Sequence, residues 1–142
     1  MTKNNGEVPK FVADTHAVIW HMMDSSRLST EARRRFQEAD HGNAVIYVSA
    51  ITPIEMTYLV EKGKIPETVP QQFYRVIEDT RKDSYQIFEI SYELTKVFFK
   101  VPSSIIPELP DRVIAATAYH LRLPLITKDH RIHEWDGVVT IW

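Results

Sequence analysis

The chain contains no cysteine, which excludes disulfide bonds, thiolate metal sites and cysteine nucleophiles. It also lacks any hydrophobic run that approaches the roughly 20 residues needed to span a membrane. Residues 1–10 are polar and contain no apolar segment of the kind that a secretory signal requires. From these absences we expect a cytoplasmic protein that does not associate with a membrane.

Neither sign of charge predominates, because 17 Lys and Arg residues face 19 Asp and Glu residues, for a net charge of −2. This balance excludes a global field that attracts polyanions, although it is compatible with a local basic patch. The 142 residues are 44% hydrophobic and contain no repeat, low-complexity tract or long linker. This length and composition suit one globular domain with its own core. We therefore expect a flexible tail over residues 1–9 and a single domain over residues 10–142.

Short segments rich in Val, Ile and aromatic residues are predicted to be buried strands. They cover residues 11–13, 44–49, 85–90, 124–127 and 138–142. Helical patterns cover residues 15–23, 29–40, 52–63, 69–82, 91–100 and 110–123. The alternation predicts an α/β fold, in which a central, mainly parallel sheet of about five strands carries helices on both faces.

Four carboxylates follow strands or open helices of this predicted fold. Asp14 ends the first strand, Glu55 lies in the first turn of the helix after the second strand, Asp111 opens the last helix, and Asp129 follows the strand at 124–127. In parallel α/β folds, ligands bind outside the carboxyl ends of the strands. We therefore expect at least Asp14, Glu55 and Asp129 to meet at one edge of the sheet.

Each acid also has an ordinary structural interpretation. Asp14 and Asp111 can cap the helices that they precede, and Asp129 can be a turn residue. Thr52 and Glu55 have the spacing of a capping box, in which two side chains satisfy two free amides. Helix caps are common and stabilise a protein by about 1 kcal/mol, so for each acid taken singly the capping hypothesis stays open.

Taken together, converging carboxylates would repel one another and lose their charge unless a cation lay between them. Mg²⁺ and Mn²⁺ prefer such oxygen ligands and retain several waters. The chain offers no cysteine and no clear histidine pair, which disfavours zinc. A carboxylate-bound ion can polarise a phosphoryl oxygen and lower the pKa of water that attacks phosphorus.

Four segments then carry a resemblance to a known family: "FVADTH", "VSAITPIEMTYLVEKGKI", "LPDRVIAATAYHLRLPLITKDHRI" and "GVVTIW". Together they resemble a PIN domain, in particular the VapC-type toxin nucleases of bacterial toxin–antitoxin pairs, from Lys10 to Trp142. The resemblance implies a three-layer α/β/α fold, a Mg²⁺- or Mn²⁺-dependent endoribonuclease and a partner antitoxin. It also implies that the catalytic and metal-binding acids are Asp14, Glu55, Asp111 and Asp129.

Thr15 and Thr127 match small hydroxyl residues that stand beside the first and fourth acids in this family. They would orient a carboxylate or bind a metal-bound water, and capping or strand packing is the equally weighted alternative. His16 stands where many members have a small residue, which is a departure from the pattern.

Arg112, Lys128 and Arg131 flank the acids directly and are the candidate contacts to an RNA phosphate. Charge balance among the carboxylates explains them equally well. Apolar side chains left exposed would suit a homodimer or an antitoxin groove, and we expect a homodimer.

The sequence therefore predicts a ribonuclease in which Asp14 and Asp129 bind the ion and Glu55 and Asp111 assist, as the toxin of a toxin–antitoxin pair. The alternatives are a PIN nuclease that acts in RNA processing and is not a toxin, and a PIN-like binding module with weak catalysis. Other aspartyl phosphoryl-transfer folds fit poorly, because haloacid-dehalogenase-like enzymes need an acid at position 16, which is histidine here.

Overall fold

The strands and helices alternate along the chain, as the computed structural model shows for residues 7–142. The strands are β1 (Lys10–Ala13), β2 (Val45–Ser49), β3 (Tyr85–Phe88), β4 (Leu125–Ile126) and β5 (Thr140–Ile141). The helices are α1 (Thr15–Met22), α2 (Thr30–Asp40), α3 (Ile51–Glu61), α4 (Thr68–Ile77), α5 (Tyr92–Phe98), α6 (Leu109–Leu121) and α7 (His130–Glu134).

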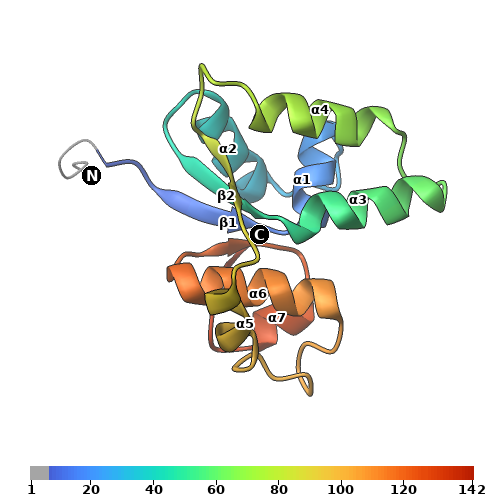
Figure 1. The fold of residues 1–142 in the computed structure, drawn as a ribbon. Helices are drawn as coiled ribbons and strands as arrows, with labels where there is room; N and C mark the ends of the chain where they lie inside the picture. The colour runs from blue at the N-terminus through green and yellow to red at the C-terminus, as the bar shows by residue number, and fades with distance from the viewer. Residues whose placement is uncertain (1–6) are drawn as a thin grey trace.

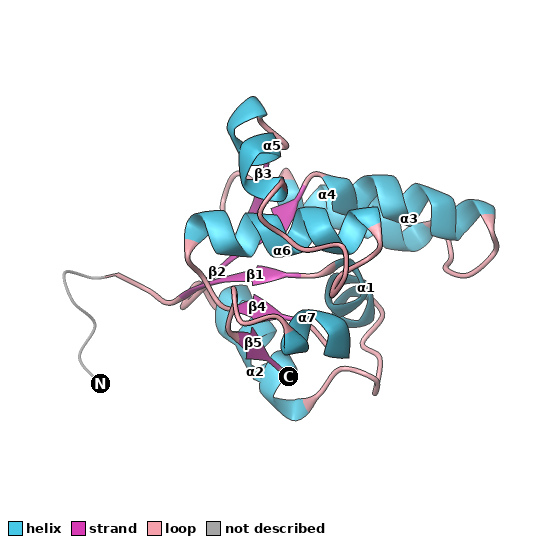
Figure 2. Cartoon of the chain, turned by 90° about the horizontal axis from the view of Figure 1, so that it is seen from below, coloured by secondary structure: helices cyan, strands magenta, loops and turns pink. Residues whose placement is uncertain are grey.

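The strands form one parallel sheet in the order β3-β2-β1-β4-β5. The chain builds β1, β2 and β3 outward in one direction, and then crosses back to place β4 on the other side of β1 (Figure 2). The strand order therefore reverses between β1 and β4. In open parallel sheets, such a switch point is the usual location of a ligand site.

Helices cover both faces of this sheet, with α1, α2 and α4 on one side and α5, α6 and α7 on the other (Figure 1). Alternate residues of β1 point to opposite faces, as expected for a strand. Phe11 and Ala13 pack in one hydrophobic cluster, whereas Val12 packs in the other. Each cluster thus buries one face of the same sheet.

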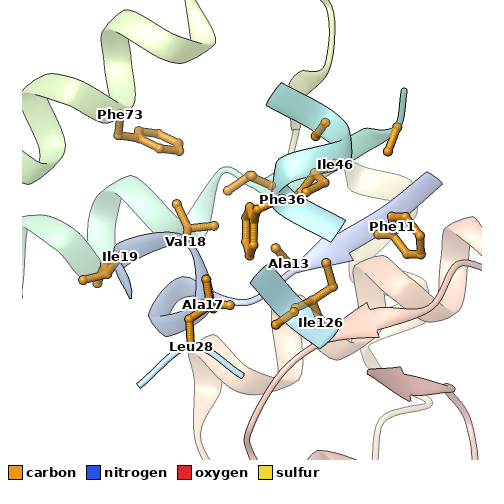
Figure 3. Packing of buried hydrophobic residues seen from close by; sticks show 14 of the residues in the cluster. Phe11, Ala13, Ala17, Val18, Ile19, Leu28, Phe36, Ile46, Phe73 and Ile126 are labelled. Carbon is orange, nitrogen blue, oxygen red and sulfur yellow. The ribbon is translucent and has the colours of Figure 1, made fainter. Parts of the chain in front are cut away.

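The larger cluster is organised around Phe36 of α2, which is fully buried between Val18 of α1 and Ile46 of β2 (Figure 3). Phe73 of α4 and Ile126 of β4 belong to the same cluster. Side chains from four other elements, α2, α4, β2 and β4, therefore hold α1 against the sheet.

Several strands are shorter than the sequence predicts. The predicted strands 124–127 and 138–142 contract to Leu125–Ile126 and Thr140–Ile141. Pro124 has no N–H to donate, although its carbonyl accepts from Val12 N at 2.9 Å. The strand predicted over 85–90 ends at Phe88, and Ile90 is 41% exposed. The hydrophobic runs thus extend beyond the residues that pair in the sheet.

Among the helices, the largest differences from the prediction are one early end and one helix that was not predicted. The helix predicted over 69–82 ends at Ile77, because the Asp79 side chain accepts a bond from Arg81 N at 3.0 Å and turns the chain. Helix α7 was not predicted, and its N-cap is Asp129. The predicted N-cap Ser29 is confirmed, since its side chain accepts from Ala32 N at 3.1 Å.

Most of the predicted tail, residues 1–6, lies outside the described residues. The Pro9 carbonyl accepts from Val45 N at 2.9 Å beside the start of β1. None of the helices in residues 7–142 is long and apolar enough to cross a membrane.

Candidate active site

The site lies at the carboxyl ends of β1 and β4, at the switch point of the sheet. Asp14 follows β1 directly, and its N–H donates to Ile126 O of β4 at 3.1 Å. Asp129 lies three residues beyond β4. The two parallel strands therefore bring together acids that are far apart in the sequence.

Asp14 is buried, with 9% of its surface exposed, and both of its carboxylate oxygens are engaged. Oδ1 accepts from Ala17 N at 2.8 Å, which caps α1. Oδ2 accepts from the Thr127 hydroxyl. Thr127 in turn accepts from Asp129 N at 3.0 Å. One hydroxyl thus connects the first acid to the backbone of the fourth.

Glu55 is held by a second chain of hydroxyls. The Thr15 hydroxyl donates to Glu55 Oε1 at 2.5 Å and lies 2.9 Å from the Thr52 hydroxyl. Because Thr15 has a single hydroxyl proton, Thr52 is the donor between the two threonines. Thr15, the first residue of α1, therefore orients the carboxylate of Glu55, which lies on the neighbouring helix α3.

These contacts decide the capping hypotheses. Asp14 and Asp129 do cap α1 and α7. The capping box at Thr52 and Glu55 is wrong, because α3 begins at Ile51 and has no side-chain cap. Asp111 does not cap α6 either, since Glu108 is the N-cap and makes no capping bond with its side chain. Glu55 and Asp111 thus have no role in helix capping.

The four acids line one open cleft of about 430 Å³. The other side chains along its wall are Thr15, His16, Trp20, Lys128, His130 and Arg131. Four of these, Lys128, Arg131 and the two histidines, carry or can carry positive charge beside the carboxylates. A cleft of this kind can hold a cation and an anionic group at the same time.

The electrostatics show that the acids are crowded. Burial raises the pKa of Asp14 from 3.8 to about 6, although bonds from Thr127 and Ala17 lower it. The pKa of Asp111 is raised to about 7, mainly by burial and also by the charges of Asp129 and Glu55. Burial also raises the pKa of Glu55, although the bond from Thr15 lowers it. Without a cation between them, Asp14, Glu55 and Asp111 therefore ionise less readily than free carboxyl groups do.

The predicted phosphate contacts separate into two groups. Lys128 lies at the cleft with Nζ 5.8 Å from the centroid of the Trp20 ring, and Arg131 Nη1 lies 3.6 Å from Glu108 Oε1. Arg112 is not at the cleft. Its guanidinium donates to Val101 O at 2.8 Å and stacks 4.2 Å from the Phe98 ring centroid. The structure therefore brings Lys128 and Arg131 to the acids but not Arg112.

The PIN domain family matches residues 11–138 of this chain. The chain belongs to the PIN domain family. Over 133 residues it is 29% identical to Ribonuclease VapC22 of Mycobacterium tuberculosis. The aligned region covers 91% of this chain and 95% of that protein. The predicted resemblance is thus confirmed.

Solved structures share the architecture. VapBC2 from Rickettsia felis, bound to a DNA fragment from its promoter, matches with a TM-score of 0.68 and 15% identity, over 93% of this chain and 97% of that chain. A toxin–antitoxin complex from Klebsiella pneumoniae matches with a TM-score of 0.61 and 24% identity, over 91% and 95% of the two chains. The predicted three-layer α/β/α fold is confirmed by this likeness.

The acids of this PIN domain fit a hard divalent cation in donor type and in charge. All four offer carboxylate oxygen, and their mutual repulsion falls when a cation lies among them. Within residues 7–142, no three acidic or histidine side chains are gathered closely enough to share one ion directly. Mg²⁺ commonly binds through one or two carboxylates and several waters, so the donor set suits it without a closed cage of side chains.

Two residues that affect the PIN cleft were not predicted from the sequence, one that lines it and one whose charge acts on its acids. Trp20 is half-buried and lines the cleft from the second turn of α1. Its spacing of four residues from His16 places both on one helix face, a pattern that could have shown this. Glu108 was not considered, although its charge raises the pKa of both Asp111 and Glu55.

Proposed function

We propose that this PIN domain is a divalent-metal-dependent endoribonuclease and the toxin of a toxin–antitoxin pair. The observation that carries the proposal is the convergence of Asp14, Glu55, Asp111 and Asp129 on one cleft. The carboxyl pKa values of Asp14, Glu55 and Asp111 are raised there. Two of these acids make no capping bond, so helix stability does not account for their position. The ribonuclease name of the relative that is 29% identical supports the same activity.

The acids and the hydroxyls of the cleft would have different roles in hydrolysis. Asp14 and Asp129 would hold Mg²⁺ or Mn²⁺, with Glu55 and Asp111 assisting directly or through water. The ion supplies Lewis-acid chemistry and a lowered pKa for water. Thr127 and Thr15 fix the directions of the Asp14 and Glu55 carboxylates. Fixed carboxylates reduce the reorganisation that the transition state requires.

Lys128 and Arg131 are the cations that would position the scissile phosphate. Both line the cleft with the acids. Water attacks phosphorus, and the bond from phosphorus to the 3′ oxygen breaks. The products are a 5′-phosphate on one fragment and a 3′-hydroxyl on the other. Phosphate contacts of this kind orient the strand and carry no sequence information.

A protein partner is the second part of the proposal. An apolar groove of about 300 Å³ runs between α5 and α6, and Phe98, Leu109 and Val113 line it. Tyr92 and Phe99 nearby are 74% and 89% exposed. Exposed apolar surface of this kind suits a protein interface, so we expect a cognate antitoxin and a homodimer. Light scattering of the purified chain, alone and with the product of an adjacent small gene, measures both.

The decisive experiment compares the wild type with Asp111→Asn on mixed-sequence RNA, with and without Mg²⁺ or Mn²⁺. We expect metal-dependent fragments with 5′-phosphate ends from the wild type and at least a hundredfold slower cleavage from the variant, as for the loss of transition-state charge stabilisation. Asp83→Asn, an exposed position outside the cleft, is the matched control. Full activity in Asp111→Asn would contradict the proposed site, and a wild type that binds RNA without cleaving it would indicate a binding module.

A further inference from the structure

A second groove opens beside the acid cleft and shares His16 and Trp20 with it. We call it the side groove. It has a volume of about 470 Å³ and lies between α1 and the segment that follows α3. Its floor includes Leu59 and Ile65, which are partly buried in the larger hydrophobic cluster. The two depressions therefore form one continuous path along α1.

The charges of the side groove differ from those of the acid cleft. Arg27 and Lys64 are exposed on its rim, and no carboxylate lines it. Neither forms an ion pair with any residue of the described chain. The basic run at 33–35 is different, because its arginines pair with Asp24, Glu31 and Glu38. Arg27 and Lys64 thus keep their charge available to an anionic ligand.

Two aromatic rings mark the junction of the groove and the cleft. The rings of His16 and Trp20 lie 5.7 Å apart, and His16 is exposed. From His16 to Met23, which both line the side groove, α1 and its C-cap advance about 10 Å, which is close to the length of three stacked nucleotides. Aromatic faces next to unpaired cations are the two features that single-stranded nucleic-acid sites combine.

We propose that the side groove is a subsite for the RNA strand that flanks the scissile phosphate. The strand passes His16 and Trp20, a base packs over the apolar floor, and Arg27 and Lys64 contact the adjacent phosphates. This inference rests on the proposed ribonuclease function and adds to it the path of the substrate. The groove holds single-stranded RNA because a paired base could not leave its stack to reach the floor.

The test measures binding separately from cleavage. In an Asp111→Asn background with Mg²⁺, a fluorescein-labelled oligouridylate and a mixed-sequence RNA, each about twelve nucleotides long, are titrated at several salt concentrations. The groove variant is Arg27→Gln with Lys64→Gln. The matched control is Lys62→Gln with Arg75→Gln, which removes the same charge from exposed positions that line neither depression.

We expect the groove variant to bind roughly tenfold more weakly, with its salt slope reduced by about 0.7 for each cation removed, and the control pair to change little. In the catalytically intact protein, the groove substitutions raise KM and leave kcat unchanged. Equal losses in both pairs would show a general charge effect and overturn the subsite. RNA cleavage by the wild type with no change in the groove variant would also overturn it and leave the proposed function standing. If the wild type neither binds nor cleaves RNA, both fail.

Discussion

The Thr127 hydroxyl donates to Oδ2 of Asp14, a residue 113 positions earlier in the chain, across the switch point of the sheet. The same hydroxyl accepts from Asp129 N at 3.0 Å. The Thr127 hydroxyl oxygen, just beyond the carboxyl end of β4, therefore fixes both the direction of the Asp14 carboxylate and the position of the Asp129 backbone. Any change at Thr127 acts on two acids at once.

Thr127→Val removes this link at nearly constant volume, and Thr127→Ser retains it. Because the Thr127 bond lowers the pKa of Asp14, its loss raises that pKa above about 6. We expect Thr127→Val to lower the free energy of unfolding by about 2 kcal/mol above about pH 7, where the lost bond is to a charged group. The loss shrinks as pH falls through the folded pKa of Asp14. Urea titrations across this pH range measure it, and an equal loss in Thr127→Ser would contradict the explanation.

Asp111→Asn should stabilise the metal-free protein at neutral pH. The folded pKa of Asp111, about 7, lies above its ordinary value of 3.8, so ionisation disfavours folding as pH rises through this interval. Asparagine does not ionise. Because Asp111 is partly exposed, we discount the full shift and expect a gain of about 1 kcal/mol above pH 7 and none below about pH 4.

Urea denaturation in EDTA over the same pH series measures this gain. Asp83→Asn is again the control, since its side chain is exposed and lies outside the cleft. A gain that is constant with pH would rule out ionisation of Asp111 as its source.

Divalent-ion binding should weaken in acid. Protons compete for Asp14 and Asp111, whose pKa values are about 6 and about 7, so Mn²⁺ must displace them below neutral pH. We expect the affinity for Mn²⁺ to fall roughly tenfold or more between about pH 8 and about pH 6. Isothermal calorimetry of the wild type measures this. Affinity that is independent of pH would mean that the ion binds away from these two acids.

A network distant from the cleft predicts a change in stability alone. The Tyr85 hydroxyl donates to Asp40 at 2.6 Å, and Asp40 also lies 3.2 Å from His21 Nε2. Tyr85→Phe should lower the free energy of unfolding by about 1–2 kcal/mol, because a hydrogen bond to a charged group is lost. Tyr74→Phe, whose ring is 47% exposed, is the control. Thermal unfolding measures the difference, and RNA cleavage should stay unchanged in both variants.

The amino-acid sequence determined the fold class through its periodicity. Phe11, Val12 and Ala13 are all apolar and point alternately to the two faces of the sheet, as suits a strand with two buried faces. Helical patterns between the strands require a parallel sheet. The ends of the elements were less predictable, because apolar residues such as Ile90 continue beyond the paired ladder. Helix α7 was missed because five residues are too few for a periodic pattern.

The four acids were also chosen from the sequence, since each follows a strand or opens a helix. Only the tertiary structure decided which of them cap a helix. Capping depends on which backbone amide a carboxylate reaches, and this separates Asp14 and Asp129, which cap, from Glu55 and Asp111, which do not. Their raised pKa values depend on burial and on charges brought from other elements. Arg112 adjoins Asp111 in sequence yet turns to Val101, because the side chains of neighbouring helix residues point in different directions.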